Sequence, residues 1–387
     1  MKPLDGKIGK EPIALVPQSI PEEVTEADEA IFFRIVSEAL DEEQRDRILT
    51  PARIHPRQEA VLAVHWHPEF VPMDLIRRRV AATFPRMTES LIIPTQHNEL
   101  TSYNGYTGVE VDCYSVGFNQ KVQLLLHFET DRVENAGVLR EMLAHTFKYR
   151  SSQLFEFIRT ITRPDEERLD TAAAETGANE ALVRFVQAYV RKIETLLDRH
   201  VGDIPPRSIK NKLLRNFFNS LRPEYGDTLI DRVQTFLVAV KRIVKQHFPL
   251  TFFYRTREII EEARRYNAGI VIPHPEQFWP VLLADYDVDG VEVWNPQSHR
   301  YTQFLISVLN EKNRRRGANQ RPLLIFMGDD THMGEKTLDP AVQSPEKASR
   351  EIGVQPAWDD MSVRKTLIKA GIDREKVISV YKARLAG

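Results

Sequence analysis

Short apolar segments alternate with amphipathic ones along much of the chain, and this alternation limits the possible folds more than any other feature. The apolar segments are typical of strands buried on both faces. They lie at residues 59–65, 91–94, 269–273, 290–294 and 322–327, with further strands expected at 109–111 and 121–128. Apolar residues recur at helical spacing at 29–47, 74–84, 256–266, 300–316, 362–370 and 374–384. Strands that alternate with helices predict an α/β fold with a parallel sheet or barrel.

The middle of the chain has a different character. From about residue 138 to 247 no strand-like segment occurs, and broad apolar stripes at helical spacing run over 181–197 and 227–248. This pattern predicts an inserted all-helical subdomain. We therefore expect an N-terminal arm and helix, the first part of an α/β barrel, a helical insertion, and the second barrel part with C-terminal helices. The expected bounds are 1–58, 59–150, 151–250 and 251–387.

Composition excludes several classes of protein. Lys and Arg total 53 and Asp and Glu total 55, for a net charge of −2, which gives no electrostatic footprint for nucleic acid. The single cysteine, Cys113, excludes an intramolecular disulfide framework and a cysteine-rich zinc site. No apolar run reaches the ~18 residues that span a bilayer, and residues 1–12 lack the apolar core of a secretory signal. We expect a cytoplasmic protein with no membrane segment.

Five of the eleven histidines come at or just beyond the end of an expected buried strand. His65 and His67 end the first strand, His97 follows the second, and His274 and His332 follow two later ones. In parallel α/β folds, ligands and chemistry gather at this edge. Five histidines in this position are difficult to explain by packing alone, so they predict a metal site. The histidines at 55, 145, 200 and 247 lie in arm or helical segments and are expected to be surface or packing residues.

Carboxylates occur in the same segments. Glu110 and Glu292 each lie in a Gly-Val-Glu-Val strand, where a buried carboxylate is costly unless it is paired, protonated or bound to a metal. Asp330 lies two residues before His332. Imidazoles and carboxylates without a thiolate suit zinc, manganese or iron.

These stretches resemble the motifs of the PHP (polymerase and histidinol phosphatase) superfamily of metal-dependent phosphoesterases, in that family's order. Residues 63–67 are similar to its opening H-x-H strand, 93–98 to its T-D-H-N motif, and 108–111 to its G-x-E strand. Residues 268–275 are similar to its A-H-P motif and 328–332 to its closing G-S-D-A-H. With the strand at 290–295, the resemblance covers about 60–130 and 255–335. It implies a distorted (β/α)7 barrel with two or three divalent transition metals, Mn, Zn or Fe, at its C-terminal mouth.

The resemblance also implies roles for individual residues. One metal would be held by His65, His67, Glu110 and Asp330. Glu110 and His274 would contribute to a second metal, and His97 and His332 to a third. Asp330, His332 and Glu110 are the implied catalytic residues.

Three positions depart from the family pattern. Met73 stands where the family has an Asp or His, with Asp74 one position further on and Glu69 earlier. Gln96 replaces the aspartate of T-D-H, and Gln123 stands at the start of a strand where the family has a histidine. His127, four residues later, is one candidate for that missing role.

The predicted function is that of a metal-dependent phosphoesterase, in which two or three cations activate water on a phosphate ester. His299, Asp329 and His127 are candidates for a general acid. The near-neutral charge favours a small phosphorylated substrate over nucleic acid.

Two alternatives stay open at this point. One is a degenerate PHP module that binds metal or a partner, which the three departures favour. The other is an amidohydrolase-type enzyme that cleaves a C–N bond, although such enzymes close with a lone Asp rather than the D-x-H seen here.

Overall fold

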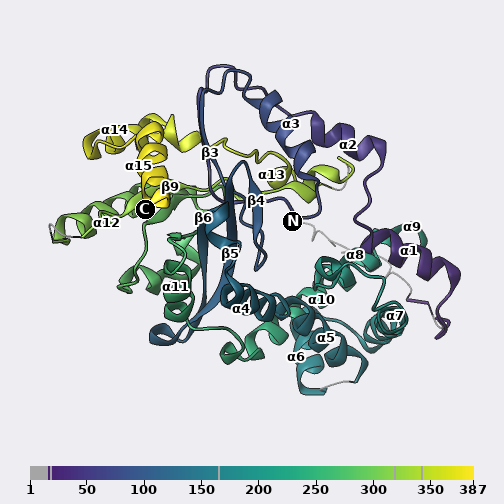
Figure 1. Cartoon of the computed structure of the whole chain (residues 1–387). Helices are drawn as coiled ribbons and strands as arrows, with labels where there is room; N and C mark the ends of the chain where they lie inside the picture. The colour runs from purple at the N-terminus through teal and green to yellow at the C-terminus, as the bar shows by residue number, and fades with distance from the viewer. Residues whose placement is uncertain (1–15, 18–19, 164–165, 318–319, 341–342) are drawn as a thin grey trace, which may run out of the picture. The chain divides into compact units, whose positions relative to one another are not determined.

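The computed structural model describes residues 16–17, 20–163, 166–317, 320–340 and 343–387. The chain divides into two compact units. One comprises Met1–Glu38 and Tyr149–Phe248, and we call it the helical unit. The other comprises Ala39–Lys148 and Pro249–Gly387, and we call it the α/β unit. Figure 1 labels their helices and strands.

The helical unit contains only helices and connecting segments in its described residues. Its helices are α1 (Glu26–Val36), α5 (Tyr149–Thr162), α6 (Glu166–Thr176), α7 (Glu180–Arg199), α8 (Lys212–Ser220), α9 (Arg222–Tyr225) and α10 (Asp227–His247). The stripes expected on α7 and α10 form its core, where Phe185 and Phe236 are fully or almost fully buried. An ion pair of 2.8 Å between Lys192 Nζ and Asp28 Oδ2 joins α7 to α1 inside this unit.

The single helix predicted at 29–47 is wrong. The chain forms α1 and then a separate helix α2 (Glu42–Leu49) in the α/β unit. Asp41 caps the N-terminus of α2. Its side chain accepts the Gln44 N–H, and the Gln44 side chain in turn accepts the Asp41 N–H. This reciprocal cap starts a new helix where the apolar spacing alone suggested continuity. The extended arm predicted at 1–27 falls mostly on residues 1–15 and 18–19, outside the described residues.

The α/β unit is built on a six-stranded sheet of order β4-β5-β6-β7-β8-β9. Its strands are β4 (Thr101–Tyr103), β5 (Tyr106–Ser115), β6 (Gln120–Glu129), β7 (Gly269–Ile272), β8 (Gly290–Trp294) and β9 (Leu324–Met327). Pairing is antiparallel from β4 to β7 and parallel from β7 to β9. Two further parallel pairs join β1 (Ala60–Ala63) to β3 (Glu89–Ile92) and β2 (Trp66–His67) to β10 (Thr331–His332).

Helices of the α/β unit flank these strands. Besides α2 they are α3 (Met73–Thr83), α4 (Gly137–Phe147), α11 (Thr256–Arg264), α12 (Thr302–Arg315), α13 (Pro345–Ala348), α14 (Met361–Ala370) and α15 (Arg374–Ala386). The helices predicted at 74–84, 256–266, 300–316, 362–370 and 374–384 are confirmed within two residues at each end. The C-terminal helix α15 packs against β1, β6 and β9. Among the described helices, none combines the length and the hydropathy of a bilayer-crossing segment.

The expected parallel sheet is in fact mixed. Strands β5 and β6 form a long antiparallel hairpin whose register runs from Tyr106 opposite Glu129 to Ser115 opposite Gln120. The assigned strands of the described chain form three separate sheets, so the structure shows a mixed α/β architecture. The predicted (β/α)7 barrel stays a prediction.

Backbone contacts nevertheless bring the ends of the separate strand pairs together. Asp330 N donates to His65 O at 2.9 Å, which ties the segment after β9 to the end of β1. Glu110 N donates to Gln96 O at 3.1 Å, which ties β5 to the segment after β3. Gly108 allows this last approach, because a Cβ there would lie 2.3 Å from Pro94 O. The segments that carry the predicted ligands therefore meet.

Candidate metal centre

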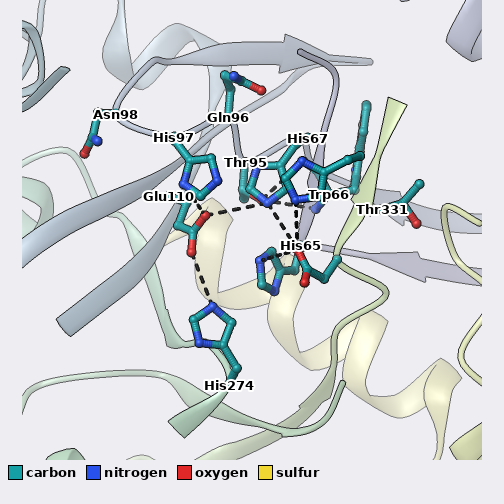
Figure 2. A network of polar contacts seen from close by, with 12 residues as sticks. His65, Trp66, His67, Thr95, Gln96, His97, Asn98, Glu110, His274 and Thr331 are labelled. Atoms are coloured by element: carbon teal, nitrogen blue, oxygen red, sulfur yellow. Dashed lines mark hydrogen bonds and ion pairs between the residues drawn. The ribbon is translucent and has the colours of Figure 1, made fainter. Parts of the chain in front are cut away.

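All seven side chains predicted as metal ligands gather where these segments meet. His65 follows β1, His67 ends β2, His97 follows β3, and Glu110 lies within β5. His274 follows β7, Asp330 follows β9, and His332 ends β10. His97 and His332 are partly exposed and the other five are buried. Figure 2 shows the acceptor side chain of Glu110 directed at the surrounding histidines.

These residues form three groups whose ligand atoms lie within 4.8 Å of one another. The groups are His65–His67–Asp330, His65–Glu110–His274 and His67–His97–His332. His65 and His67 each belong to two groups, so the three groups are contiguous. The clusters are compatible with metal binding, because imidazole and carboxylate donors at this spacing suit divalent transition metals.

Two carboxylates occupy the centre of the cluster. Asp330 Oδ1 lies 3.7, 3.5 and 3.4 Å from the Nε2 atoms of His65, His67 and His332. These separations exceed good hydrogen bonds. They match the spacing of two ligand atoms on one cation when each bond is ~2.1 Å.

Glu110 makes the second set of contacts. Its Oε2 lies 2.7 Å from His97 Nδ1 and 3.6 Å from His67 Nε2, and its Oε1 lies 3.4 Å from His274 Nε2. The dashed lines in Figure 2 join Glu110 to both His97 and His274. One carboxylate therefore faces two of the three groups.

The backbone is strained around this cluster. Asp330, His274, Asn98 and Glu69 have φ angles of 47°, 24°, 55° and 52°. Positive φ is uncommon for residues other than glycine, and such residues concentrate at functional sites. Here the strained residues lie in, or directly beside, the segments that carry the candidate ligands.

Glu292 contacts two of the histidines, His65 and His274, and holds them in place. Its Oε1 lies 2.8 Å from His65 Nδ1, and its Oε2 accepts the His274 N–H at 2.8 Å. Gly328 leaves room for this carboxylate, because a Cβ there would lie 1.6 Å from Glu292 Oε1. With Nδ1 engaged by Glu292, His65 presents Nε2 to the cluster. A carboxylate on the far nitrogen is the usual support of a metal-binding histidine.

Arg350 contacts the cluster directly, and sequence reasoning missed it. Its side chain is 3% exposed, and Nη1 donates to Asp330 Oδ2 at 2.9 Å and to Asp330 O at 3.1 Å. Nη2 donates to Glu346 at 2.8 Å. Arg350 lies outside the stretches that carry the family motifs, and no local pattern marks it.

Glu69 lies beside His332, while Met73 takes no part in the cluster. The Oε1 atom of Glu69 is 3.5 Å from His332 Nδ1, and the Oε2 atom of Glu69 accepts the Gly334 N–H at 2.8 Å. Gln96 accepts the Glu69 N–H at 3.1 Å and so supports this loop. Met73 is the first residue of α3, and it packs against a cluster of buried apolar side chains.

The remaining candidates lie outside the three groups. His127 uses both ring nitrogens on protein atoms, at 2.8 Å from Tyr381 Oη and 2.9 Å from Val64 O, which leaves no nitrogen for a metal. Gln123 pairs with Asp112 in the hairpin. His299 is exposed at the start of a 3-10 turn, and Asp329 is buried and accepts the Gly353 N–H at 3.0 Å.

The charges of the cluster are strongly coupled. Burial disfavours charge on His65, but Glu292, Asp330 and Glu110 outweigh it and raise the pKa of His65 to about 10. Burial, with His332 and His97, lowers the pKa of His67 to about 3. Burial opposes ionisation of Glu110, yet His97 and His274 hold its pKa well below the usual range. The cluster's own charges thus leave His65 protonated, Glu110 ionised and His67 uncharged at neutral pH, and metal binding at His65 Nε2 requires loss of that proton.

Several donor atoms of the cluster are buried without a hydrogen-bond partner in the described part of the chain. They include His65 Nε2, both ring nitrogens of His67, and His274 Nδ1. Leaving a buried polar atom unpaired costs ~1–3 kcal/mol, so a concentration of such atoms needs a compensating ligand. A divalent cation supplies that compensation, and the residues present therefore fit the metals that the sequence implied.

No protein-family model matches the sequence, and no curated protein matches it. One similar solved structure comes from Bifidobacterium adolescentis and is provisionally assigned as a metal-dependent phosphoesterase. The two chains are 15% identical, with a TM-score of 0.37 over 81% of this chain and 97% of the other. A likeness this low does not assign a fold, so the function is derived below from the cluster itself.

Proposed function

We propose that the α/β unit is a metal-dependent phosphoesterase that hydrolyses a small phosphate ester. The main support for this proposal is the set of three contiguous ligand groups, which share His65 and His67. Cations held by these groups would polarise a phosphoryl oxygen and lower the pKa of a bound water.

The chain's own residues have distinct tasks in this proposal. Asp330 Oδ1 and the Nε2 atoms around it would hold one cation, and Glu110 would contribute ligand atoms beside His67, His97 and His274. Glu292 keeps His65 in the tautomer with Nε2 free for binding. Arg350 fixes the carboxylate of Asp330 by occupying Oδ2. These contacts orient the ligands before a substrate arrives.

The proposal extends to the barrel. In such a barrel the strand pairs β1–β3 and β2–β10 would lie between the two edges of the six-stranded sheet. The backbone contacts of Asp330 with His65 and of Glu110 with Gln96 support this placement. The same proposal includes three further points. The α/β unit forms a PHP-type (β/α)7 barrel, its metals are Mn, Zn or Fe, and the protein is cytoplasmic. The support for the barrel is the order of the motifs along the chain.

The degenerate-module alternative has one observation in its favour, the departures at Met73, Gln96 and Gln123. Glu69 weakens that observation, because a carboxylate approaches His332 from a different sequence position. The amidohydrolase alternative finds no such support. Both Asp330 and His332 contribute to the ligand groups, whereas such enzymes close with a lone Asp.

The test is hydrolysis by the metal-loaded protein of a panel of phosphomonoesters, phosphodiesters and N-acyl compounds. We expect phosphate release from a phosphomonoester, abolished by a chelator and restored by added Mn²⁺ or Zn²⁺. Release of an amine from the N-acyl compounds alone favours the amidohydrolase alternative. Tight metal binding without turnover of any compound favours the degenerate module.

A further inference from the structure

A cavity of about 760 Å³ lies beside the cluster in the α/β unit. Residues that end or follow β8 line one side, among them Trp294 and Arg300, and Asp329 after β9 lines another. The cavity thus opens at the carboxyl ends of two parallel strands, where α/β proteins bind ligands. Arg350, which holds Asp330, forms part of the same wall, although none of the seven candidate ligands lines the cavity.

The lining combines apolar residues with neutral polar and charged ones. The apolar residues are Trp294, Pro296, Val354, Pro356, Ala357 and Val363. Gln303, Ser349 and Ser362 add an amide and two hydroxyls. A volume in the range of ~300–1,000 Å³ with such walls is typical of sites for organic molecules. It is much larger than a phosphate group requires.

The ionisable groups on the lining give it no excess of positive charge. Three carboxylates, Asp329, Glu346 and Asp360, lie in the lining with two guanidinium groups, those of Arg300 and Arg350, and the imidazole of His299. Arg350 is already engaged by Asp330 and Glu346. The cavity therefore suits an uncharged group with an apolar ring face and hydrogen-bonding substituents, and not a second phosphate or a nucleic-acid strand.

We propose that this cavity receives the leaving group of the substrate, an uncharged ring-bearing alcohol esterified to phosphate, and this inference rests on the proposed phosphoesterase function. In the reaction the oxygen of water bonds to phosphorus and the bond from phosphorus to the alcohol oxygen breaks. The proton lost by water ends on the alcohol oxygen. The products are inorganic phosphate and the free alcohol.

The test measures binding and needs no turnover. Benzylphosphonate and methylphosphonate are titrated calorimetrically into the Mn²⁺-loaded protein. Both carry the same phosphonate, but only the first carries a ring. We expect benzylphosphonate to bind at least ~10-fold more tightly, because a buried ring removes apolar surface from water. Equal affinities would overturn the cavity assignment and leave the proposed function standing. Failure of both compounds to bind would overturn the proposed function and this inference with it.

Matched variants locate the effect. Gln303 is exposed on α12, lines the cavity, and donates to Ser362 O at 3.4 Å. Gln303→Trp fills the cavity from its rim, and we expect it to remove the preference for benzylphosphonate while methylphosphonate binds unchanged. Ser349→Trp, from a different segment, should do the same. The control is Ser307→Trp, one turn along α12 on an exposed position outside the cavity, which should keep the preference. A preference that survives both cavity variants would place the ring elsewhere and contradict the inference.

Discussion

Arg350 and Asp330 form a buried ion pair in which the guanidinium takes one carboxylate oxygen and leaves the other to the histidines. Arg350 Nη1 lies 2.9 Å from Asp330 Oδ2, whereas Asp330 Oδ1 lies 3.4–3.7 Å from three imidazole nitrogens. Asp330 also has a φ of 47°, and Arg350 binds its carbonyl oxygen as well. The side chain of Arg350 thus holds Asp330 both in its strained backbone conformation and in its side-chain rotamer.

The first prediction concerns this pair. Arg350→Met frees Asp330 Oδ2, so we expect the affinity of the apoprotein for Mn²⁺ or Zn²⁺ to fall ~10–100-fold, the range seen when a ligand loses its supporting contact. Arg350→Lys should recover part of the loss, because it keeps the charge. Calorimetric metal titration measures both. Arg314→Met, on an exposed position of α12, is the control. Unchanged affinity in a folded Arg350→Met protein would remove Arg350 from the proposed support.

The second prediction concerns Glu292. Glu292→Gln removes the negative charge behind His65, and we expect a ~10–100-fold loss of metal affinity. Asp289→Asn is a matched control, because Asp289 is a buried carboxylate of the same unit that pairs with Arg264 and Arg384 and not with the cluster. That control should lower the free energy of unfolding and leave metal affinity unchanged. Similar metal affinities for the two variants would contradict the orienting role of Glu292.

The third prediction concerns Glu69, which takes a position near His332. Glu69→Gln should weaken only the group His67–His97–His332, so one cation should bind ~10-fold more weakly while the others bind unchanged. Metal titration resolved into separate equivalents makes this measurement. Met73→Leu, which changes the residue at the family's position, should alter nothing. A uniform loss across all equivalents after Glu69→Gln would mean that the loop, and not one ligand group, depends on Glu69.

The fourth prediction concerns the helical unit. Burial opposes ionisation of Asp28, but bonds from Lys192 and Thr25 outweigh it and lower its pKa below the ordinary 3.8. A lowered pKa stabilises the fold above the unfolded pKa, and this stabilisation is lost as pH falls through the folded pKa. Asp28→Asn should therefore cost ~3 kcal/mol of unfolding free energy at pH 7, because it leaves Lys192 buried and unpaired.

Urea unfolding at several pH values measures this difference. We expect it to shrink steadily below about pH 4, where the unfolded carboxyl takes up a proton. Glu23→Gln, at an exposed position before α1, is the control and should be neutral throughout. A difference between wild type and Asp28→Asn that stays constant down to the lowest pH would show that charge on Asp28 is not its source.

Sequence reasoning located the strand-end histidines because that information is local. The apolar residues 60–63 predict a buried strand, and the sequence itself shows that His65 and His67 come directly after it. Once such strands lie parallel, their ends meet at one edge, and the structure does bring His65, His97 and His332 to one place. Their role as metal ligands stays a prediction.

The contacts that complete the cluster were not predictable in the same way. Arg350 approaches Asp330 across 20 residues of chain, and Glu69 approaches His332 across 263, so neither contact has a periodic signal. The antiparallel β5–β6 hairpin was also missed as such, because apolar runs do not record strand direction. The break between α1 and α2 depended on the cap at Asp41, a contact of individual side chains and not a pattern.

The most direct test of the proposed metal centre is elemental analysis of the purified protein and of Asp330→Asn. We expect more than one equivalent of Mn, Fe or Zn per chain in the wild type, because three contiguous ligand groups are present. Asp330→Asn keeps the shape but removes a full charge beside three imidazoles, and it should lower metal content together with a ~100-fold loss of hydrolysis, ~2.7 kcal/mol. Less than ~0.2 equivalents in the wild type, even after reconstitution with each metal, would contradict a metal centre of any kind.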